Sequence, residues 1–197
     1  MTQKQADQLY KKIADIKRIL AAEKRKFGCH DDSRGLRYNP VRYYTQLGDF
    51  KGGLTYLRWF HKNFTDDASF PDFLFEWTII LFKSGKFKDA DSKAIQAFCS
   101  NIHLFDSFLD RPIVPVEPWE QPSITADSFS AYFDSIGKQT SLVDFAKWLA
   151  AFVATERFRN SASRFIGFNR QLYGENDLAK RRHLVEQLGK LLVGTSV

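Results

Sequence analysis

This chain of 197 residues is 44% hydrophobic and 15% aromatic, a composition that excludes an intrinsically disordered protein. Its formal charge of +6 comes from dispersed basic residues, so it permits an acidic partner but does not by itself indicate nucleic acid. Two cysteines exclude a disulfide framework, and the N-terminal segment is too polar for a secretory signal. No apolar run reaches the roughly 18 residues of a membrane span, so we expect a cytoplasmic protein.

The N-terminal segment predicts one long amphipathic helix, Gln3 to Lys26. Leu9, Ile13 and Ile16 recur at helical spacing, with Lys and Gln residues opposite them. Gly28 ends this helix, since glycine readily adopts the left-handed conformation at a helix C-terminus.

The stretch from Cys29 to Tyr38 is the most polar part of the chain. A cysteine, a histidine and two aspartates within four residues could bind a metal ion, but adjacent residues seldom all point at one ion. We therefore expect no metal or cofactor site. The alternative is a helix start, in which Asp31, Asp32 or Ser33 caps backbone amides and Arg34 and Arg37 pair with the carboxylates.

Four helices are predicted in the next seventy or so residues. Their expected ranges are Asn39 to Leu47, Leu54 to Phe64, Asp72 to Lys83, and Phe87 to Asn101. Gly48 and Gly85 end the first and the third, and Pro71 opens the third. That third helix is apolar almost all round, so we expect it to be buried on several sides.

The helical pattern breaks over an irregular, proline-rich insertion at about 102–124. A short helix over 102–109 is followed by extended chain, because each proline also restrains the residue before it. Such an insertion is either functional or a brace packed on the scaffold. The apolar side chains of Ile113, Val114, Val116 and Trp119 favour the brace.

Four helices are expected after the insertion. Their predicted ranges are 126–136, Leu142 to Glu156, Asn160 to Leu172 and about 177–193, the last capped by Asn176 or Asp177. The final helix is amphipathic and rich in leucine.

A repeated helix-turn-helix pattern organises the chain. Gly48 and Gly85 stand 37 residues apart, and a degenerate third copy follows Glu156. The aligned positions are Phe50 with Phe87, Gly53 with Ala90, Leu57 with Ala94 and Phe60 with Ala97, and then Phe158, Ser161, Phe165 and Phe168 in the third copy. The aromatic residue is expected to pack between the two helices of the hairpin, and the small residue to lie where two helices cross closely.

At these residues the chain resembles the tetratricopeptide repeat (TPR) family, whose hairpins have a turn glycine, an aromatic two residues later and an alanine three beyond. The resemblance covers 36–66, 72–101 and a degenerate copy over 142–173. The segment 31–38 also resembles a lead-in of some uncharacterised bacterial proteins with such repeats. The resemblance implies one all-α domain over 1–197, with antiparallel hairpins stacked as a short right-handed superhelix.

The TPR resemblance further implies a scaffold for protein–protein or peptide interaction, with a concave groove. The first helix of each hairpin supplies the groove candidates Arg37, Tyr44, Glu76 and Lys147. Arg37 and Tyr44 are seven residues apart, hence on one helix face, and could hold a carboxylate or phosphate. The alternative for Tyr44 is a place in the core.

Three other functions remain open. A basic stripe could bind nucleic acid through Lys24 to Lys26, Arg157, Arg159, Arg164, Arg170 and Lys180 to Arg182, although no nucleic-acid motif accompanies these residues. The four histidines have no evident nucleophile partner and no phosphate-binding loop is present, so we expect no enzyme and no catalytic residue. A homodimer could form through Tyr56, Trp59 or the final helix.

Overall fold

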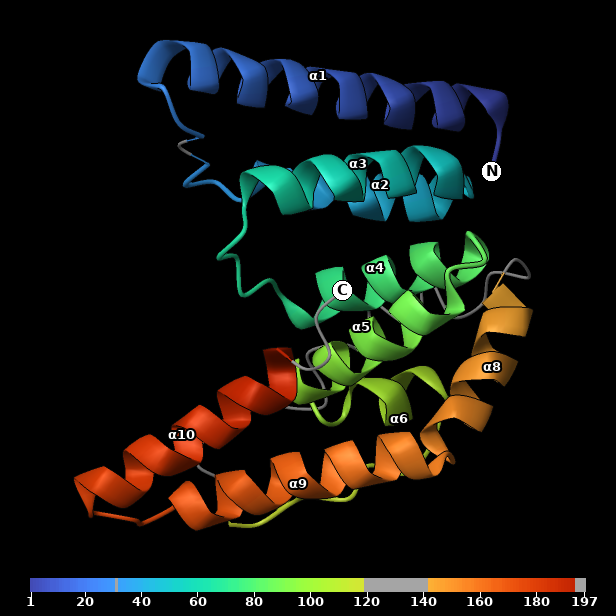
Figure 1. Cartoon of the computed structure of the whole chain (residues 1–197). Coiled ribbons are helices and arrows are strands. Elements are labelled where there is room, and N and C mark those ends of the chain that lie inside the picture. The colour runs from blue at the N-terminus through green and yellow to red at the C-terminus, as the bar shows by residue number, and fades with distance from the viewer. Residues whose placement is uncertain (31, 119–141, 194–197) are drawn as a thin grey trace. The chain divides into compact units, whose positions relative to one another are not determined.

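The computed structural model describes residues 1–30, 32–118 and 142–193 (Figure 1). Every regular element in these ranges is a helix, which confirms the predicted all-α fold. None of these helices combines the length and the apolar character that crossing a bilayer requires. The chain divides into two compact units, Met1–Lys86 and Phe87–Val197.

The helices follow the predicted order closely. The first unit contains α1 (Gln3–Phe27), the 3-10 turn η1 (Leu36–Tyr38), α2 (Asn39–Leu47), α3 (Phe50–Asn63) and α4 (Pro71–Lys83). The second contains α5 (Phe87–Ser100), α6 (Leu104–Phe108), α8 (Val143–Val153), α9 (Glu156–Leu172) and α10 (Leu178–Val193). The two helices of the predicted hairpin over 72–101 are therefore α4, in the first unit, and α5, in the second.

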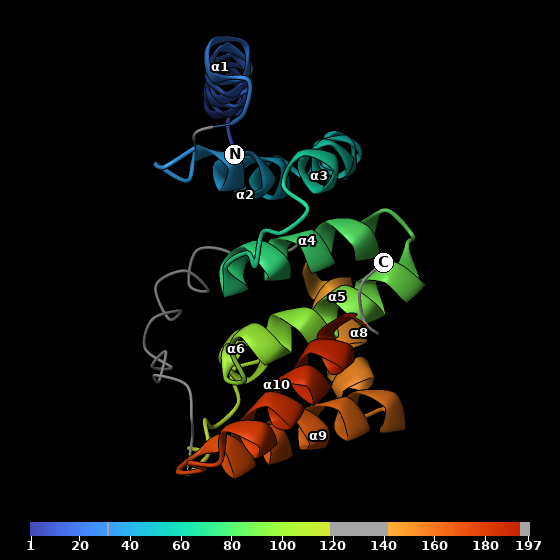
Figure 2. The same ribbon diagram turned by 60° about the vertical axis from the view of Figure 1, so that its left-hand side comes forward.

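The first unit has three layers of helices. The antiparallel pair α2 and α3 forms the middle layer, with α1 on one side of it and α4 on the other (Figures 1 and 2). Only Ile13, Ile16 and Leu20 of α1 are buried, so α1 contacts the unit along a single narrow face. The core between the layers is formed by Ile13, Val41, Tyr44, Tyr56, Leu57, Phe60, Phe73 and Ile80.

The predicted turn at Gly48 is confirmed. Gly48 has a φ of 68°, in the left-handed region that favours glycine, and its amide closes the last turn of α2. Asp49 then caps α3 by accepting from the amide of Gly52 at 2.9 Å. A two-residue connection with both helix ends satisfied therefore reverses the chain.

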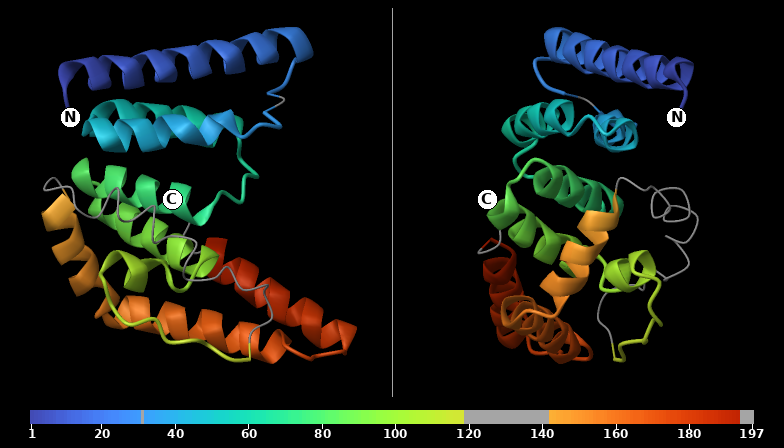
Figure 3. Two further views of the ribbon diagram at one scale, coloured as in Figure 1. Left: turned by 180° about the vertical axis from the view of Figure 1, so that it is seen from behind. Right: turned by 90° about the vertical axis from the view of Figure 1, so that its right-hand side faces the viewer.

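The second unit is built around phenylalanines that pack edge to face or tilted against one another. The ring centroid of Phe158, on α9, lies 5.1 Å from Phe98 of α5, 5.9 Å from Phe105 of α6 and 5.5 Å from Phe152 of α8. α9 and α10 run side by side and are joined by a turn at 173–177 (Figure 3). One residue of the predicted repeat pattern, Phe158, thus holds four helices together.

Two details of the sequence prediction were wrong. α9 begins at Glu156 rather than Asn160, because the Thr155 hydroxyl accepts from the amide of Phe158 at 3.2 Å and caps the helix. Ile113 and Val114 are 36% and 70% exposed and do not pack as the predicted brace, whereas Val116 is half-buried. Trp119 and the predicted helix over 126–136 lie outside the described residues.

Candidate functional site

A dense polar cluster surrounds Arg37 where the chain enters α2. Nε of Arg37 donates to Asp67 at 2.8 Å, and Nη1 donates to Asp32 at 3.2 Å. The hydroxyl of Tyr38 accepts from Nη2 of Arg37 and donates to Asp67, both at 2.8 Å. The amides of Leu36 and Arg37 also donate to Asp32 at 2.8 and 2.7 Å, so Asp32 makes the predicted helix-start contacts. We call Asp32, Arg37, Tyr38 and Asp67 the Arg37 cluster.

The electrostatics of the Arg37 cluster indicate a structural role. Burial, reinforced by the hydrogen bond to Asp67, raises the pKa of Tyr38 to about 12. Burial acts to raise the pKa of Asp67 as well, but hydrogen bonds from Tyr38, Arg37 and Ser69 outweigh it, and the pKa lies below its ordinary value. All three guanidinium nitrogens of Arg37 donate to groups of this chain, so the cluster joins the segment before α2 to the loop after α3.

Of the four predicted groove residues, the three in the first unit are each buried or engaged within that unit. Arg37 is occupied by its cluster, and Tyr44 is 6% exposed with its ring 6.3 Å from that of Tyr56 in the core. Glu76 is 1% exposed. Lys147 is exposed on α8, in the second unit. Tyr44 therefore takes the core position that the sequence left as the alternative, because a seven-residue spacing defines a face but not which face is buried.

Sequence reasoning missed the partner of Glu76. Nε of Arg42, on α2, donates to Oε1 of Glu76 at 3.0 Å, and its Nη2 also pairs with Asp72. Glu76 is a carboxylate in an almost wholly apolar helix, and a buried carboxylate needs a cationic partner. The sequence therefore indicated that a partner exists. It could not identify Arg42, which lies 34 positions away on another helix.

The residues around Cys29 show no metal-site geometry. Nδ1 of His30 lies 3.1 Å from the carbonyl oxygen of Leu20, and its ring packs 5.1 Å from Phe64. Cys29 is exposed. In the described parts of the chain, three or more His, Cys, Asp or Glu side chains nowhere gather as metal ligands would, and Asp31 lies outside those parts.

The arginines of α9 do not form the predicted basic stripe. Arg157 and Arg164 are seven residues apart on one side, whereas Arg159 and Arg170 lie on another side about 140° around the helix. Arg157 is also engaged, since it donates to Asp91 at 3.2 Å and to Ser92 at 3.0 Å. Residues seven or eleven positions apart lie on the same face of a helix, so each pair shares a face. The face of Arg157 and Arg164 is not the face of Arg159 and Arg170.

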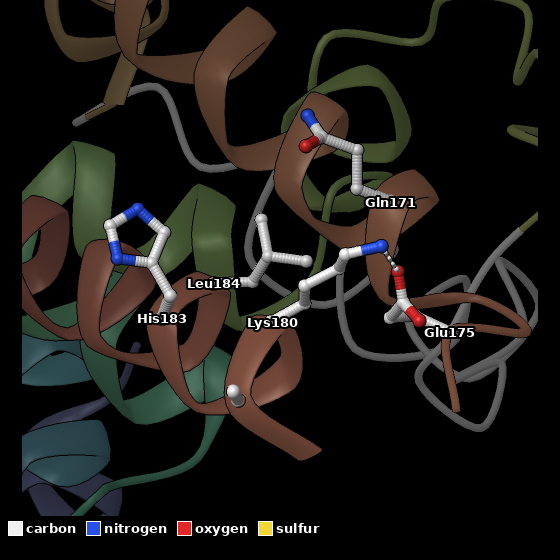
Figure 4. A pocket seen from close by; sticks show the side chains of 6 residues that line it. Gln171, Glu175, Lys180, His183 and Leu184 are labelled. Atoms are coloured by element: carbon white, nitrogen blue, oxygen red, sulfur yellow. Dashed lines mark ion pairs between the residues drawn. The ribbon is translucent and has the colours of Figure 1, made fainter. Parts of the chain in front are cut away.

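An open pocket of about 460 Å³ lies between the C-terminal part of α9 and the first turns of α10. The residues that line it are Gln171, Glu175, Ala179, Lys180, His183 and Leu184 (Figure 4). Its surface is largely apolar, and we call it the α9–α10 groove. Two hydrogen bonds stabilise the turn between the helices that form the groove. Asp177 caps α10 by accepting from the amide of Ala179 at 2.8 Å, and Arg181 donates to the carbonyl of Leu172 at 2.9 Å.

The polar groups of the α9–α10 groove stand at its rim. Nζ of Lys180 lies 3.9 Å from Oε2 of Glu175, and the Lys180 side chain is 69% exposed. Figure 4 places the His183 ring across the groove from this pair. An exposed pair at this distance contributes little stability, so Lys180 can turn toward the carboxylate of a ligand.

Comparison of the chain with protein-family models, with curated proteins and with solved structures finds no match. The TPR resemblance therefore stays a prediction from the repeat pattern, and the candidate site stands on its geometry.

Proposed function

We propose that this protein is a helical scaffold that binds a short segment of another protein in the α9–α10 groove. The observation behind the proposal is an open, largely apolar groove with Lys180 and His183 at its rim. The repeated hairpin pattern supports it, since helical repeats commonly present binding surfaces. An open groove leaves its ligand partly in solvent, which suits an extended peptide better than an enclosed small molecule.

The groove chemistry defines the ligand. Ala179 and Leu184 line the groove with apolar side chains, against which one or two aliphatic or aromatic side chains of a ligand can pack. Lys180 at the rim favours an Asp or Glu next to those side chains. The expected partner is therefore a protein segment with an acidic residue beside an apolar one.

Selection from a peptide library displayed on phage tests this function. We expect the full chain to enrich peptides that pair an apolar residue with Asp or Glu. Lys180→Glu should weaken a selected peptide about tenfold in fluorescence anisotropy, because it replaces attraction at the rim by repulsion. Arg182→Glu is the matched control, since Arg182 is exposed two positions further along α10 and does not line the groove.

Three results would count against the groove. They are no enrichment over an unrelated helical protein, equal losses from Lys180→Glu and Arg182→Glu, and unchanged binding after Ala179→Glu, which would line the groove with a charged side chain.

A further inference from the structure

Basic residues are dispersed along the chain, but nearly all of the net positive charge falls on one helix. α1 contains 8 of the 29 basic residues and only 3 of the 23 acidic ones, which leaves 21 basic against 20 acidic residues elsewhere. The basic residues are Lys4, Lys11, Lys12, Lys17, Arg18, Lys24, Arg25 and Lys26, and the acidic ones are Asp7, Asp15 and Glu23. α1 thus accounts for +5 of the formal charge of +6.

Four of these cations form a straight row. Lys4, Lys11, Arg18 and Arg25 follow one another at intervals of seven residues, and all four are exposed. Seven residues are about two turns of an α-helix, so the row stays on one face and extends over roughly 31 Å. We call these four residues the α1 stripe.

The α1 stripe points away from the rest of its unit. The buried residues of α1, Ile13, Ile16 and Leu20, lie on the opposite side of the helix by their spacing. Figure 2, which looks nearly along α1, shows α2 and α3 on one side of the helix only. Within the first unit, the stripe therefore faces away from the packed layers.

The anions of α1 only partly offset the stripe. Arg18 pairs with Asp15 at 3.0 Å, but both side chains are well exposed and such a pair is easily exchanged. Asp7 accepts a hydrogen bond from Gln3 at 2.8 Å. Lys4, Lys11 and Arg25 have no ion-pair partner among the residues that the structure describes.

Helix stability does not explain the stripe. Cations in the last turn of a helix are favoured by its dipole, which accounts for Arg25 and its neighbours. Lys4 stands in the first turn, where the dipole disfavours a cation and where α1 has no acidic residue. Lys4 and Lys11 are exposed and do not pack against the unit. Binding of an external anion therefore explains the regular spacing of the stripe better than helix stability does.

We propose that the α1 stripe binds the phosphate backbone of a nucleic-acid duplex, without sequence preference. A duplex offers closely spaced phosphates along a stiff line, which matches a straight row of cations. The exposed aromatic residues of α1, Tyr10 and Phe27, lie on other sides of the helix by their spacing, so the stripe presents neither a ring for single-stranded bases to stack on nor a large apolar side chain for a membrane interface. This surface lies in the first unit and is independent of the α9–α10 groove.

Fluorescence anisotropy with a labelled 24-base-pair DNA duplex and an RNA duplex tests the proposal. The full chain should bind both at 20 mM salt, and the logarithm of the association constant should fall with the logarithm of salt with a slope of about −3.5 for four phosphate contacts. The variant Lys4→Gln, Lys11→Gln, Arg18→Gln, Arg25→Gln should bind at least tenfold more weakly, with a slope smaller by about 3.5, because it removes all four contacts.

The control removes the same charge elsewhere, by changing the exposed residues Lys86, Lys88, Arg159 and Arg170 to Gln. It should keep at least half the affinity and the full slope, and circular dichroism should show unchanged helix content in both variants. Equal losses in the two variants would overturn the stripe, because net charge alone would then explain binding. So would no binding at 20 mM salt, or tighter binding to poly-glutamate or anionic vesicles than to the duplexes.

Discussion

At the scale of single residues, Arg37 pairs with one carboxylate that is near in the sequence and with one that is distant. The sequence placed Arg37 near a carboxylate of the polar stretch, and the structure confirms its pair with Asp32. Its second partner, Asp67, lies 30 positions away and gave no sequence signal. Because Asp67 is 6% exposed at its side chain, we expect the Arg37 cluster to contribute to stability rather than to bind a ligand.

Asp67→Asn should lower the free energy of unfolding by about 2 kcal/mol, because it removes one of the two carboxylates that pair with the guanidinium of Arg37 and weakens the hydrogen bonds from Tyr38 and Ser69. The pKa of Asp67 is lowered in the folded state, so its contribution is present above the unfolded pKa of about 4 and disappears as pH falls through the lower folded pKa. Urea unfolding of the variant should therefore depend less on pH in this acidic range than that of the unchanged chain. The exposed neighbour Asp66→Asn is the control, and an equal effect there would contradict the assignment.

At the scale of elements, the small residue of the predicted hairpin pattern has a clear reason. A Cβ at Gly53 would stand 2.7 Å from Cδ1 of Ile80 on α4 and 3.3 Å from Cβ of Tyr44 on α2. Gly53 therefore lies where α3 meets both neighbours, as the register analysis predicted. A glycine at this position lets the three helices lie closer together than a Cβ would allow.

Gly53→Ala should destabilise the chain by about 1 kcal/mol, since overpacking against Ile80 outweighs the gain in helix propensity. Ile80→Val removes the contacting Cδ1 and by itself should cost about 1 kcal/mol. The double variant should lose less than the sum of the two, with a coupling of about 1 kcal/mol in thermal or urea unfolding. Additive losses of unfolding free energy would show that the side chain of Ile80 is not what excludes a Cβ at position 53.

At the scale of the whole molecule, charge and exposed apolar surface act in opposite directions on self-association. A net charge of +6 repels copies of the chain. On α10, Leu178 and Val185 are 83% and 55% exposed and stand seven residues apart, hence on one side of the helix. A homodimer through the final helix stays a prediction. Leu178 and Val185 would lie at the centre of its interface.

Light scattering should then give a mass above the 22.8 kDa of one chain, rising with salt as the repulsion is screened. Leu178→Ser combined with Val185→Ser should restore the mass of one chain at every salt concentration. A single-chain mass for the unchanged protein from low to high salt would contradict this interface.

The helices and their turns could be predicted from the sequence, because capping residues, turn glycines and apolar periodicity act within a few residues of one another. The sequence placed α1 within one residue of its end and the Gly48 turn at its residue. Which helix faces are buried follows from the packing of helices that are distant in the sequence. Tyr44 faces the core, Arg37 and Glu76 are paired across 30 or more positions, and the α9–α10 groove arises from two helices. Those outcomes depend on contacts between distant segments, and a periodic pattern defines a face without stating what covers it.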